Sequence, residues 1–193
     1  MSHSIEHIIR ERRTIKSFTD QPLSKQTLLD LLNAAVWAPY HSSEEPWRFI
    51  IFMNEDRRKF ADAVLATYTE DELARFGEGV MKEYCLETPV HLLVVIKQDK
   101  SEVRREEALL AAATLIQNLQ LLAWEQRIGF VWKTNEYNRE DDFHRSVGIQ
   151  PDEKLVGTLH MGYLNENKIP QARKRKSAGD LITWHDGSEK NNL

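Results

Sequence analysis

The sequence has few of the features that would place it in a membrane or outside the cell. Its single cysteine, Cys85, cannot form an intramolecular disulfide or a cysteine-rich metal site. No stretch approaches the roughly 18 consecutive apolar residues that a membrane span requires. Residues 1–7 reach charged side chains without the apolar core of a secretory signal. We therefore expect a cytoplasmic protein in which Cys85 serves packing.

The motifs of several large enzyme classes are also missing. The chain has no G-x-x-x-x-G-K phosphate loop, no G-x-G-x-x-G opening a helix, no G-x-S-x-G elbow and no zinc-ligand spacing. These absences argue against most hydrolases, nucleotide kinases and conventional Rossmann dinucleotide sites. The net charge is -4, from 26 Lys and Arg against 30 Asp and Glu. Nothing global therefore attracts the chain to nucleic acid or to an anionic membrane.

Positive charge gathers instead in two short clusters, at residues 10–16 and 173–176. The first contains Arg12-Arg13-Thr14-Ile15-Lys16, which has two interpretations. Cations at the end of a helix stabilise its C-terminus. Alternatively, guanidinium groups, a hydroxyl and an ammonium together suit a phosphate-like anion. The run by itself favours the helix end, whereas a small anion held between the two clusters would account for both.

Hydrophobic spacing predicts helices that alternate with strands. Apolar repeats, cap residues and β-branched runs define the elements. Helices are expected at 3–13, from Ser24 to before Pro39, at 55–65 capped by Asn54, from the Thr69 capping box to Glu87, at 101–127, and at 138–147 closed by Gly148; strands are expected at 47–53, 91–97, 129–134 and 154–163. The pattern indicates one layered α/β or α+β domain over residues 1–193.

Three segments carry more apolar character than an exposed position needs. Residues 91–97 read as a strand buried on both faces, which belongs at the centre of a sheet. The helix at 108–123 is apolar on nearly every side, so it lies inside the domain or in a subunit interface. The tail at 165–193 is polar and basic but contains Leu181-Ile182-Thr183-Trp184. We expect this tail to dock on another surface, such as a second subunit.

Two further polar segments are weak candidates when taken alone. His41 and residues 42–47 lie in a loop between helix and strand, where polar side chains either contact a ligand or satisfy a turn. Trp132-Lys133-Thr134 lies at the carboxyl end of a predicted strand. Those residues are ligand contacts or ordinary strand-edge residues.

Taken together and in order, the segments resemble the FMN-dependent nitroreductase family, especially its compact, YdjA-like members. The set comprises residues 12–16 after the first helix, Ala38-Pro39-Tyr40-His41 followed by Pro46-Trp47-Arg48-Phe49, Trp132-Lys133-Thr134 and the basic tail. The resemblance implies a three-layer α+β nitroreductase-like fold. Its sheet is mixed and mainly antiparallel, helices flank it, and the C-terminal segment is exchanged across a homodimer.

The resemblance also implies which residues hold FMN at the subunit interface. One subunit supplies the basic run, with the arginines toward the phosphate and Lys16 toward the ring, and the partner supplies residues around His41. The tail cations close on the phosphate, and the segment 132–134 lies against the ring. The implied cofactor-binding residues are Arg12, Arg13, Thr14, Lys16, Trp37, His41, Ser43, Trp132, Lys133, Thr134, Arg173 and Arg175.

The function implied is an NAD(P)H-dependent oxidoreductase. Hydride from NADH or NADPH would pass through flavin N5 to a nitroaromatic, quinone or similar acceptor in a ping-pong scheme. No side chain acts as a nucleophile, and Lys16 tunes the flavin electrostatically. Other chemistry on the same scaffold stays open, namely dehalogenation, alkene reduction or flavin fragmentation, as does a non-catalytic FMN-binding protein.

The chain departs from the family pattern near the implied substrate pocket. Trp37 stands where compact members can have an arginine, and Ser43 and Glu45 replace the amides common before Pro-Trp. Phe130 and Asn135 replace small residues or glycine near the ring segment. These changes bear on the substrate more than on flavin binding, and Phe130 is expected to narrow or reshape the pocket.

Overall fold

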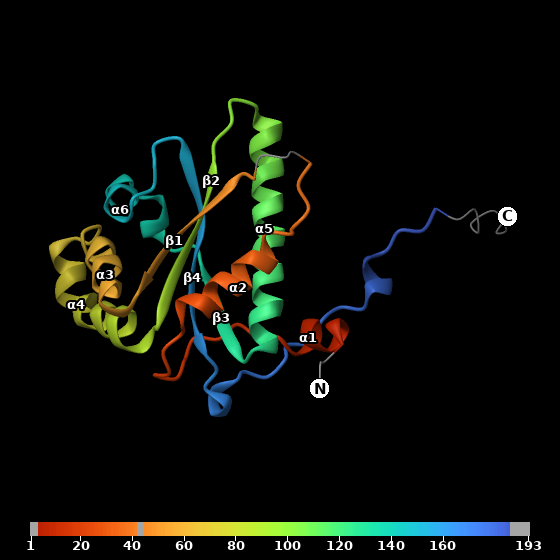
Figure 1. Ribbon diagram of the computed structural model, residues 1–193, viewed down its shortest axis with the longest axis horizontal. Helices are drawn as coiled ribbons and strands as arrows, with labels where there is room; N and C mark the ends of the chain where they lie inside the picture. Colours follow the sequence, from red (N-terminus) through yellow and green to blue (C-terminus); the bar gives the residue numbers. More distant parts are fainter. Residues whose placement is uncertain (1–3, 42–44, 186–193) are drawn as a thin grey trace.

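The computed structural model describes residues 4–41 and 45–185. Four strands form one sheet in the order β1-β2-β4-β3, with helices on both faces (Figure 1). The strands are β1 (Trp47–Met53), β2 (Val90–Lys97), β3 (Ile128–Lys133) and β4 (Glu153–Tyr163). The α-helices are α1 (Ile5–Glu11), α2 (Lys25–Ala35), α3 (Arg57–Leu65), α4 (Glu70–Met81), α5 (Glu102–Glu125) and α6 (Asp141–Val147). The predicted three-layer α+β fold is confirmed.

Every pair of neighbouring strands is antiparallel. The described residues contain one parallel pairing, the isolated bridge between Thr14 and Phe130 at the outer side of β3. Strand β2 lies between β1 and β4, and its residues Leu92, Leu93 and Val94 are fully buried. The central position expected for 91–97 is therefore confirmed. Within the described residues, no helix is long and apolar enough to cross a membrane.

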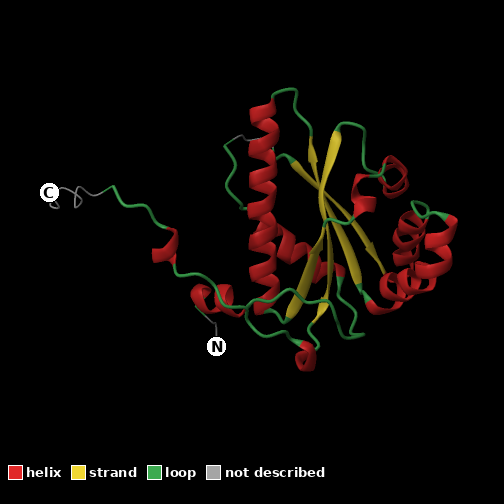
Figure 2. Cartoon of the chain, turned by 180° about the vertical axis from the view of Figure 1, so that it is seen from behind, coloured by secondary structure: helices red, strands yellow, loops and turns green. Residues whose placement is uncertain are grey.

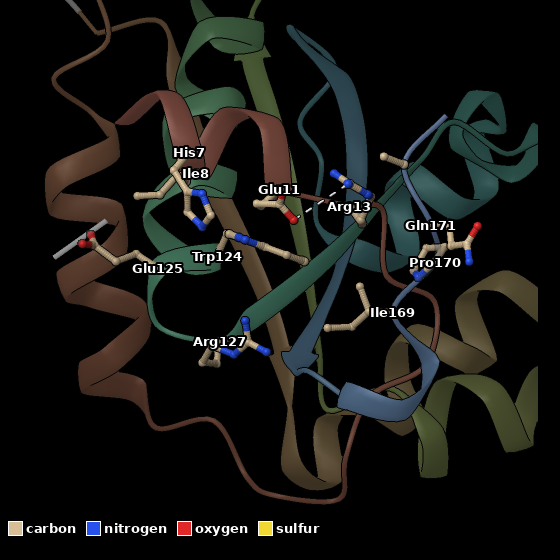
Figure 3. Close-up of a pocket in the computed structure, with 11 residues that line it drawn as sticks. His7, Ile8, Glu11, Arg13, Trp124, Glu125, Arg127, Ile169, Pro170 and Gln171 are labelled. Carbon is tan, nitrogen blue, oxygen red and sulfur yellow. Dashed lines mark ion pairs between the residues drawn. The ribbon is translucent and has the colours of Figure 1, made fainter. Parts of the chain in front are cut away.

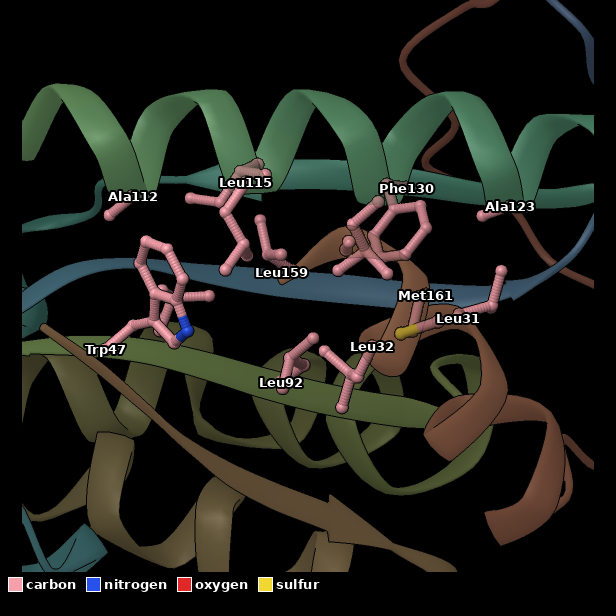
Figure 4. Close-up of a cluster of buried hydrophobic side chains, with 14 of the residues drawn as sticks. Leu31, Leu32, Trp47, Leu92, Ala112, Leu115, Ala123, Phe130, Leu159 and Met161 are labelled. Atoms are coloured by element: carbon pink, nitrogen blue, oxygen red, sulfur yellow. The ribbon is translucent and has the colours of Figure 1, made fainter. Parts of the chain in front are cut away.

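The sheet separates two hydrophobic cores. On one face α2 and α5 pack over the strands through side chains such as Leu31, Leu115 and Leu159 (Figure 4). On the other face α3 and α6 contribute Phe60 and Phe143, with α4 packed against α3 (Figure 2). Both cores follow from the alternation of side chains along each strand.

Helix α5 presents apolar side chains on its outer side as well. Its inner stripe of Ala112, Leu115, Leu119 and Ala123 is buried, but Leu110 is 68% exposed. The long apolar helix is thus partly inside the domain, and in the single chain part of its apolar surface faces outward.

A pair of glycines lets the N-terminal segment cross the sheet. Gly129 of β3 pairs with Gly162 of β4. A Cβ at Gly129 would lie 2.6 Å from Ile15 Cβ, and one at Gly162 would lie 3.0 Å from Phe18 Cβ. Residues 15–18 therefore cross β3 and β4 at van der Waals distance, on the face opposite α5, because these two positions have no side chain.

Three local predictions need correction. Asn54 does not cap α3: it has φ 55° and opens a 3₁₀ turn, Asn54–Asp56, before the helix begins at Arg57. The helix predicted from 138 begins at Asp141, because Asn138 is buried and its amide donates to Lys133 O at 3.0 Å. The helix predicted from the Thr69 capping box to Glu87 changes at Lys82 into a π-helix, η2 (Lys82–Glu87). The capping box itself is confirmed.

The tail leaves the domain beside α1 and extends away from it (Figures 1 and 2). It contains a 3₁₀ turn, Ala178–Leu181, capped by Ser177 and Asp180. Leu181 and Trp184 are 69% and 70% exposed. Ile169 at the start of the tail is partly buried against Ile15 and Trp124, whereas Leu181 and Trp184 are not buried by any described part of the chain.

Candidate functional site

The basic run predicted from the sequence lies along the outer edge of β3. Ile15 N–H donates to Phe130 O at 2.8 Å, which fixes the run against this strand. Ile15 is buried, whereas Thr14 and Lys16 on either side of it are exposed. Backbone pairing thus presents the hydroxyl of Thr14 and the ammonium of Lys16 at one end of the sheet edge.

Arg13 is engaged at the end of α1. Its Nη1 donates to Arg10 O at 2.6 Å and to Arg12 O at 3.0 Å, and its Nη2 lies 4.0 Å from a Glu11 carboxylate oxygen. Arg13 lines a pocket of about 390 Å³ between α1, the end of α5 and the start of the tail (Figure 3). Arg13 therefore makes the contacts expected of a cation at the C-terminal end of a helix.

Arg12 has a different environment. Its side chain is half-buried, and burial lowers its pKa, with the positive charges of Arg13 and Arg175 lowering it further. Arg12 makes no ion pair with any carboxylate among the described residues. The structure thus brings together cations from both sequence clusters, and the positive potential around Arg12 favours an anion.

The carboxyl half of β3 offers backbone groups at the same edge. Residues two apart on a strand direct their backbone groups to the same side. Because Phe130 turns its carbonyl toward Ile15, Trp132 turns its N–H and C=O outward as well. Neither group has a hydrogen-bond partner among the residues that the structure describes. The indole of Trp132 lies against Gly157 on the α5 face.

Lys133 and Thr134 complete this segment. Lys133 points to the opposite face from Trp132, and its Nζ lies 2.5 Å from Glu83 Oε1 and 3.5 Å from Tyr84 Oη. Its carbonyl accepts the hydrogen bond from Asn138. Thr134 is exposed just beyond the strand. The segment predicted to contact a ligand is therefore anchored at Lys133 and open at its outer edge.

Other predicted site residues lie elsewhere in the single chain. His41 Nε2 lies 3.6 Å from a Glu107 oxygen, near the start of α5, whereas the basic run packs near Trp124 at its end. The separation of 17 positions in sequence corresponds to about 25 Å of helix. Trp37 is 86% exposed, Arg173 is exposed, and Ser43 lies outside the described residues. Within the described chain His41 thus lies away from the basic run, and Trp37 presents its side chain to solvent.

A buried polar cluster behind Lys133 was not predicted from the sequence. It consists of Tyr84, His91 and His160, all buried, with Glu83 at its surface. His91 and His160 sit in strands that read as continuous apolar runs, and Glu83 and Tyr84 lie in a segment that reads as ordinary helix. No local signal marks these residues, because the register between strands brings them together.

Comparison with known proteins identifies the family. The model of the nitroreductase family matches residues 9–163. The chain belongs to the nitroreductase family. It is 35% identical over 190 residues to YfhC of Bacillus subtilis, covering 94% of each chain, and 24% identical over 164 residues to YdjA of Escherichia coli, covering 82% of this chain and 87% of YdjA. Both are named as NAD(P)H nitroreductases. The predicted membership, close to YdjA-like members, is confirmed.

Solved structures agree with this nitroreductase assignment. A nitroreductase-like family protein from Bacillus cereus superposes with a TM-score of 0.92 at 36% identity, covering 97% of this chain and 98% of that one. A protein named as a nitroreductase from Desulfovibrio desulfuricans, crystallised in complex with FMN, has a TM-score of 0.72 at 22% identity, covering 94% and 96%. The second likeness concerns the fold.

Proposed function

We propose that this chain is an NAD(P)H-dependent FMN oxidoreductase that reduces nitroaromatic, quinone or similar acceptors. One observation carries the proposal: a half-buried Arg12 without a carboxylate partner in the described chain, flanked by Arg13 and Arg175 at the edge of β3. Membership in the nitroreductase family and the NAD(P)H nitroreductase names of its relatives support it.

The residues present suit both ends of FMN. Arg12, Thr14 and Arg175 offer charged and hydroxyl donors for a phosphate. The outward N–H and C=O of Trp132 offer a donor and an acceptor for the polar edge of a flavin ring. Lys16, exposed on the same run, supplies positive charge toward the ring. Arg13 and Arg173 remain predicted phosphate-side residues.

Bound FMN would supply the redox chemistry, taking hydride from NADH or NADPH at N5 and passing it to the acceptor. The chain's own residues bind and orient. Arg12 and Arg175 hold the phosphate, the Trp132–Thr134 segment contacts the ring edge, and Lys16 stabilises negative charge on it. NADH or NADPH and the acceptor would occupy this site in turn, which is a ping-pong scheme.

The proposed active form is a homodimer. Leu110 on α5 and Leu181 and Trp184 of the tail are exposed apolar residues that a second subunit would cover. In that dimer Trp37, His41 and Ser43 come from the partner, and residues 165–193 dock on it. The purified protein should therefore have twice the 22.5 kDa mass of the chain, and a 22.5 kDa particle would contradict this arrangement.

The proposed function is tested by flavin content and turnover. Purified protein, reconstituted with FMN where necessary, should show a flavin absorbance spectrum and oxidise NADH or NADPH with a nitroaromatic or quinone acceptor. Protein that cannot bind FMN would contradict the proposal. Protein that binds FMN but reacts only with halogenated or alkene acceptors, or with none, would assign it another flavin chemistry or a binding role.

Lys16 is expected to change the redox properties of the flavin more than its affinity. A unit charge at about 4 Å contributes on the order of 1 to 4 kcal/mol near a protein surface. Lys16→Ala should therefore weaken reduced FMN about ten-fold relative to oxidised FMN, which lowers the two-electron midpoint potential by ~30 mV. Dye-equilibration titration measures the midpoint potential. An unchanged potential would contradict the placement of Lys16 beside the flavin ring.

A further inference from the structure

The π-helix η2 brings an acid and a phenol to the ring segment. A π-helix is rare and frequently marks a functional position, because its wider turn redirects side chains. Within η2, Glu83 and Tyr84 both contact Lys133: Glu83 Oε1 lies 2.5 Å from Nζ, and Nζ stands 5.1 Å from the centre of the Tyr84 ring. Two side chains of η2 thus converge on the ammonium of Lys133 in β3, an element distant in sequence.

The strand register places this contact on the face that the basic run also crosses. Gly129, Val131 and Lys133 alternate onto one face of β3, and Ile15 packs over Gly129. Lys16, the neighbour of Ile15, is therefore close to Gly129, the first of these positions. Lys133 is the last of them and lies four residues, or about 13 Å, farther along the strand. Lys16 thus lies beside the outer edge of β3, and Lys133 is the last residue of the same strand.

The two lysines differ in their partners. Lys133 has a side chain that is 19% exposed, and the Glu83 carboxylate pairs with it. Its backbone is also fixed, because Asn138 Nδ2 donates to its carbonyl at 3.0 Å. Lys16 is exposed and makes no ion pair within the described part of the chain. Of these two cations, only Lys16 has a charge that no carboxylate offsets.

We infer that Glu83 is a positioning residue for the flavin ring: it holds the Lys133 ammonium against Tyr84 and offsets its charge. Lys16 then remains the cation that acts on the reduced ring. This inference rests on the proposed function, since it concerns the same site. Glu83 itself contacts Lys133 and acts through it.

Glu83→Gln should therefore shift the midpoint potential of the flavin in the direction opposite to Lys16→Ala. Glu83→Gln keeps the size and hydrogen-bonding capacity of the side chain but leaves the Lys133 charge uncompensated. Reduced FMN should then bind about ten-fold more tightly relative to oxidised FMN, which raises the two-electron potential by ~30 mV. A purely structural role would weaken both redox forms together and leave the potential unchanged.

A charge cycle separates the two explanations. Lys133→Met should lower the potential, because it leaves the Glu83 carboxylate unpaired, and the double variant Glu83→Gln/Lys133→Met should return it to within about ten millivolts of wild type, or roughly two-fold in relative affinity. The matched control is Glu87→Gln in the same π-helix. Glu87 pairs with Lys82 at 3.2 Å, and both side chains are more than half exposed.

The measurements are the dissociation constant of oxidised FMN, from flavin fluorescence, and the midpoint potential of the reconstituted dimer. A raised potential in Glu83→Gln, unchanged in Glu87→Gln and restored in the double variant, supports the inference. An unchanged or lowered potential in Glu83→Gln, or an equal shift in Glu87→Gln, overturns it while FMN binding and the proposed function stand. Wild-type protein that binds no FMN overturns both.

Discussion

Alanine at both Arg12 and Arg13 should weaken FMN binding by about two to four orders of magnitude. A hydrogen bond to a charged group contributes roughly 1.5 to 3 kcal/mol, and each 1.4 kcal/mol is a factor of ten in affinity. The structure adds a reason for the large effect. Arg12 is half-buried beside two other cations, so an anion there interacts in a less polar medium than water.

The two arginines are expected to contribute by different routes. Arg13 donates to the carbonyls of Arg10 and Arg12, so its loss disturbs the end of α1 and the position of Arg12. Arg12→Ala alone should therefore cost about one to two orders of magnitude in affinity without destabilising the fold. Arg13→Ala should lower both FMN affinity and the unfolding temperature.

Arg10→Ala provides the control for general charge. Arg10 belongs to the same cluster but pairs with Glu6 at 2.9 Å, and both side chains are more than 70% exposed. An exposed charge that is already paired interacts weakly with other groups, by roughly 0 to 1 kcal/mol. Loss of the Arg10 charge should therefore change FMN affinity less than about five-fold. Titration of the apoprotein by flavin fluorescence compares the variants. Unchanged affinity in the double alanine variant would exclude the phosphate assignment.

Elements with strong local signals could be predicted from the sequence. The run 91–97 predicts a central strand because a strand buried on both faces is composed mainly of apolar side chains, and β2 occupies that place. Gly148 ends α6 with φ 80°, a backbone conformation that glycine adopts without strain. In both cases the residues of the segment itself satisfy a local physical requirement.

Elements whose form depends on distant partners could not be predicted. Asn138 suits a helix cap, yet its Nδ2 donates to Lys133 O and its Oδ1 accepts from the Thr158 hydroxyl, so the helix begins later. The π-helix η2 reads as ordinary helix in sequence, and its contacts with Lys133 arise from tertiary packing. Local propensity gives way wherever such buried partners exist.

The candidate site shows the same division. The composition of residues 12–16 indicates an anion site, but only the bridge to Phe130 shows that Thr14 and Lys16 lie at the edge of β3. The engagement of Arg13 with helix carbonyls required its side-chain contacts. His41 lies near the start of α5, away from the basic run, and Trp37 is exposed to solvent, so their assignment depends on a second subunit and stays a prediction.

The buried histidine pair should make the fold sensitive to mild acid. His91 Nε2 lies 2.8 Å from Tyr84 O, so this nitrogen carries hydrogen, and in a neutral ring His91 Nδ1 must accept. His160 Nδ1 lies 2.6 Å away and donates to it. His160 Nε2 is then a buried acceptor that no described group satisfies. The arrangement requires both rings to be neutral.

Burial lowers the pKa of His91 to about 3, although the hydrogen bond to the backbone carbonyl of Tyr84 acts in the opposite direction. Burial also lowers the pKa of His160 well below its usual value, and the His91 and Lys133 charges act in the same direction. The unfolded chain protonates both rings near their ordinary pKa of about 6.5. As pH falls below that value, the unfolded state binds protons that the folded state does not, so stability decreases.

Between pH 7.5 and pH 5 the loss should be about 2 kcal/mol per ring, or about 4 kcal/mol for the pair, out of a typical total of roughly 5 to 15 kcal/mol. Urea unfolding across this window measures it, and the window stays above the range in which paired carboxylates such as Glu153 titrate. His160→Leu should be less stable at every pH, since His91 Nδ1 loses its donor, but its stability should fall only about half as steeply with pH. A wild-type protein equally stable at both pH values, or a His160→Leu variant with the wild-type slope, would show that the pair is not held neutral.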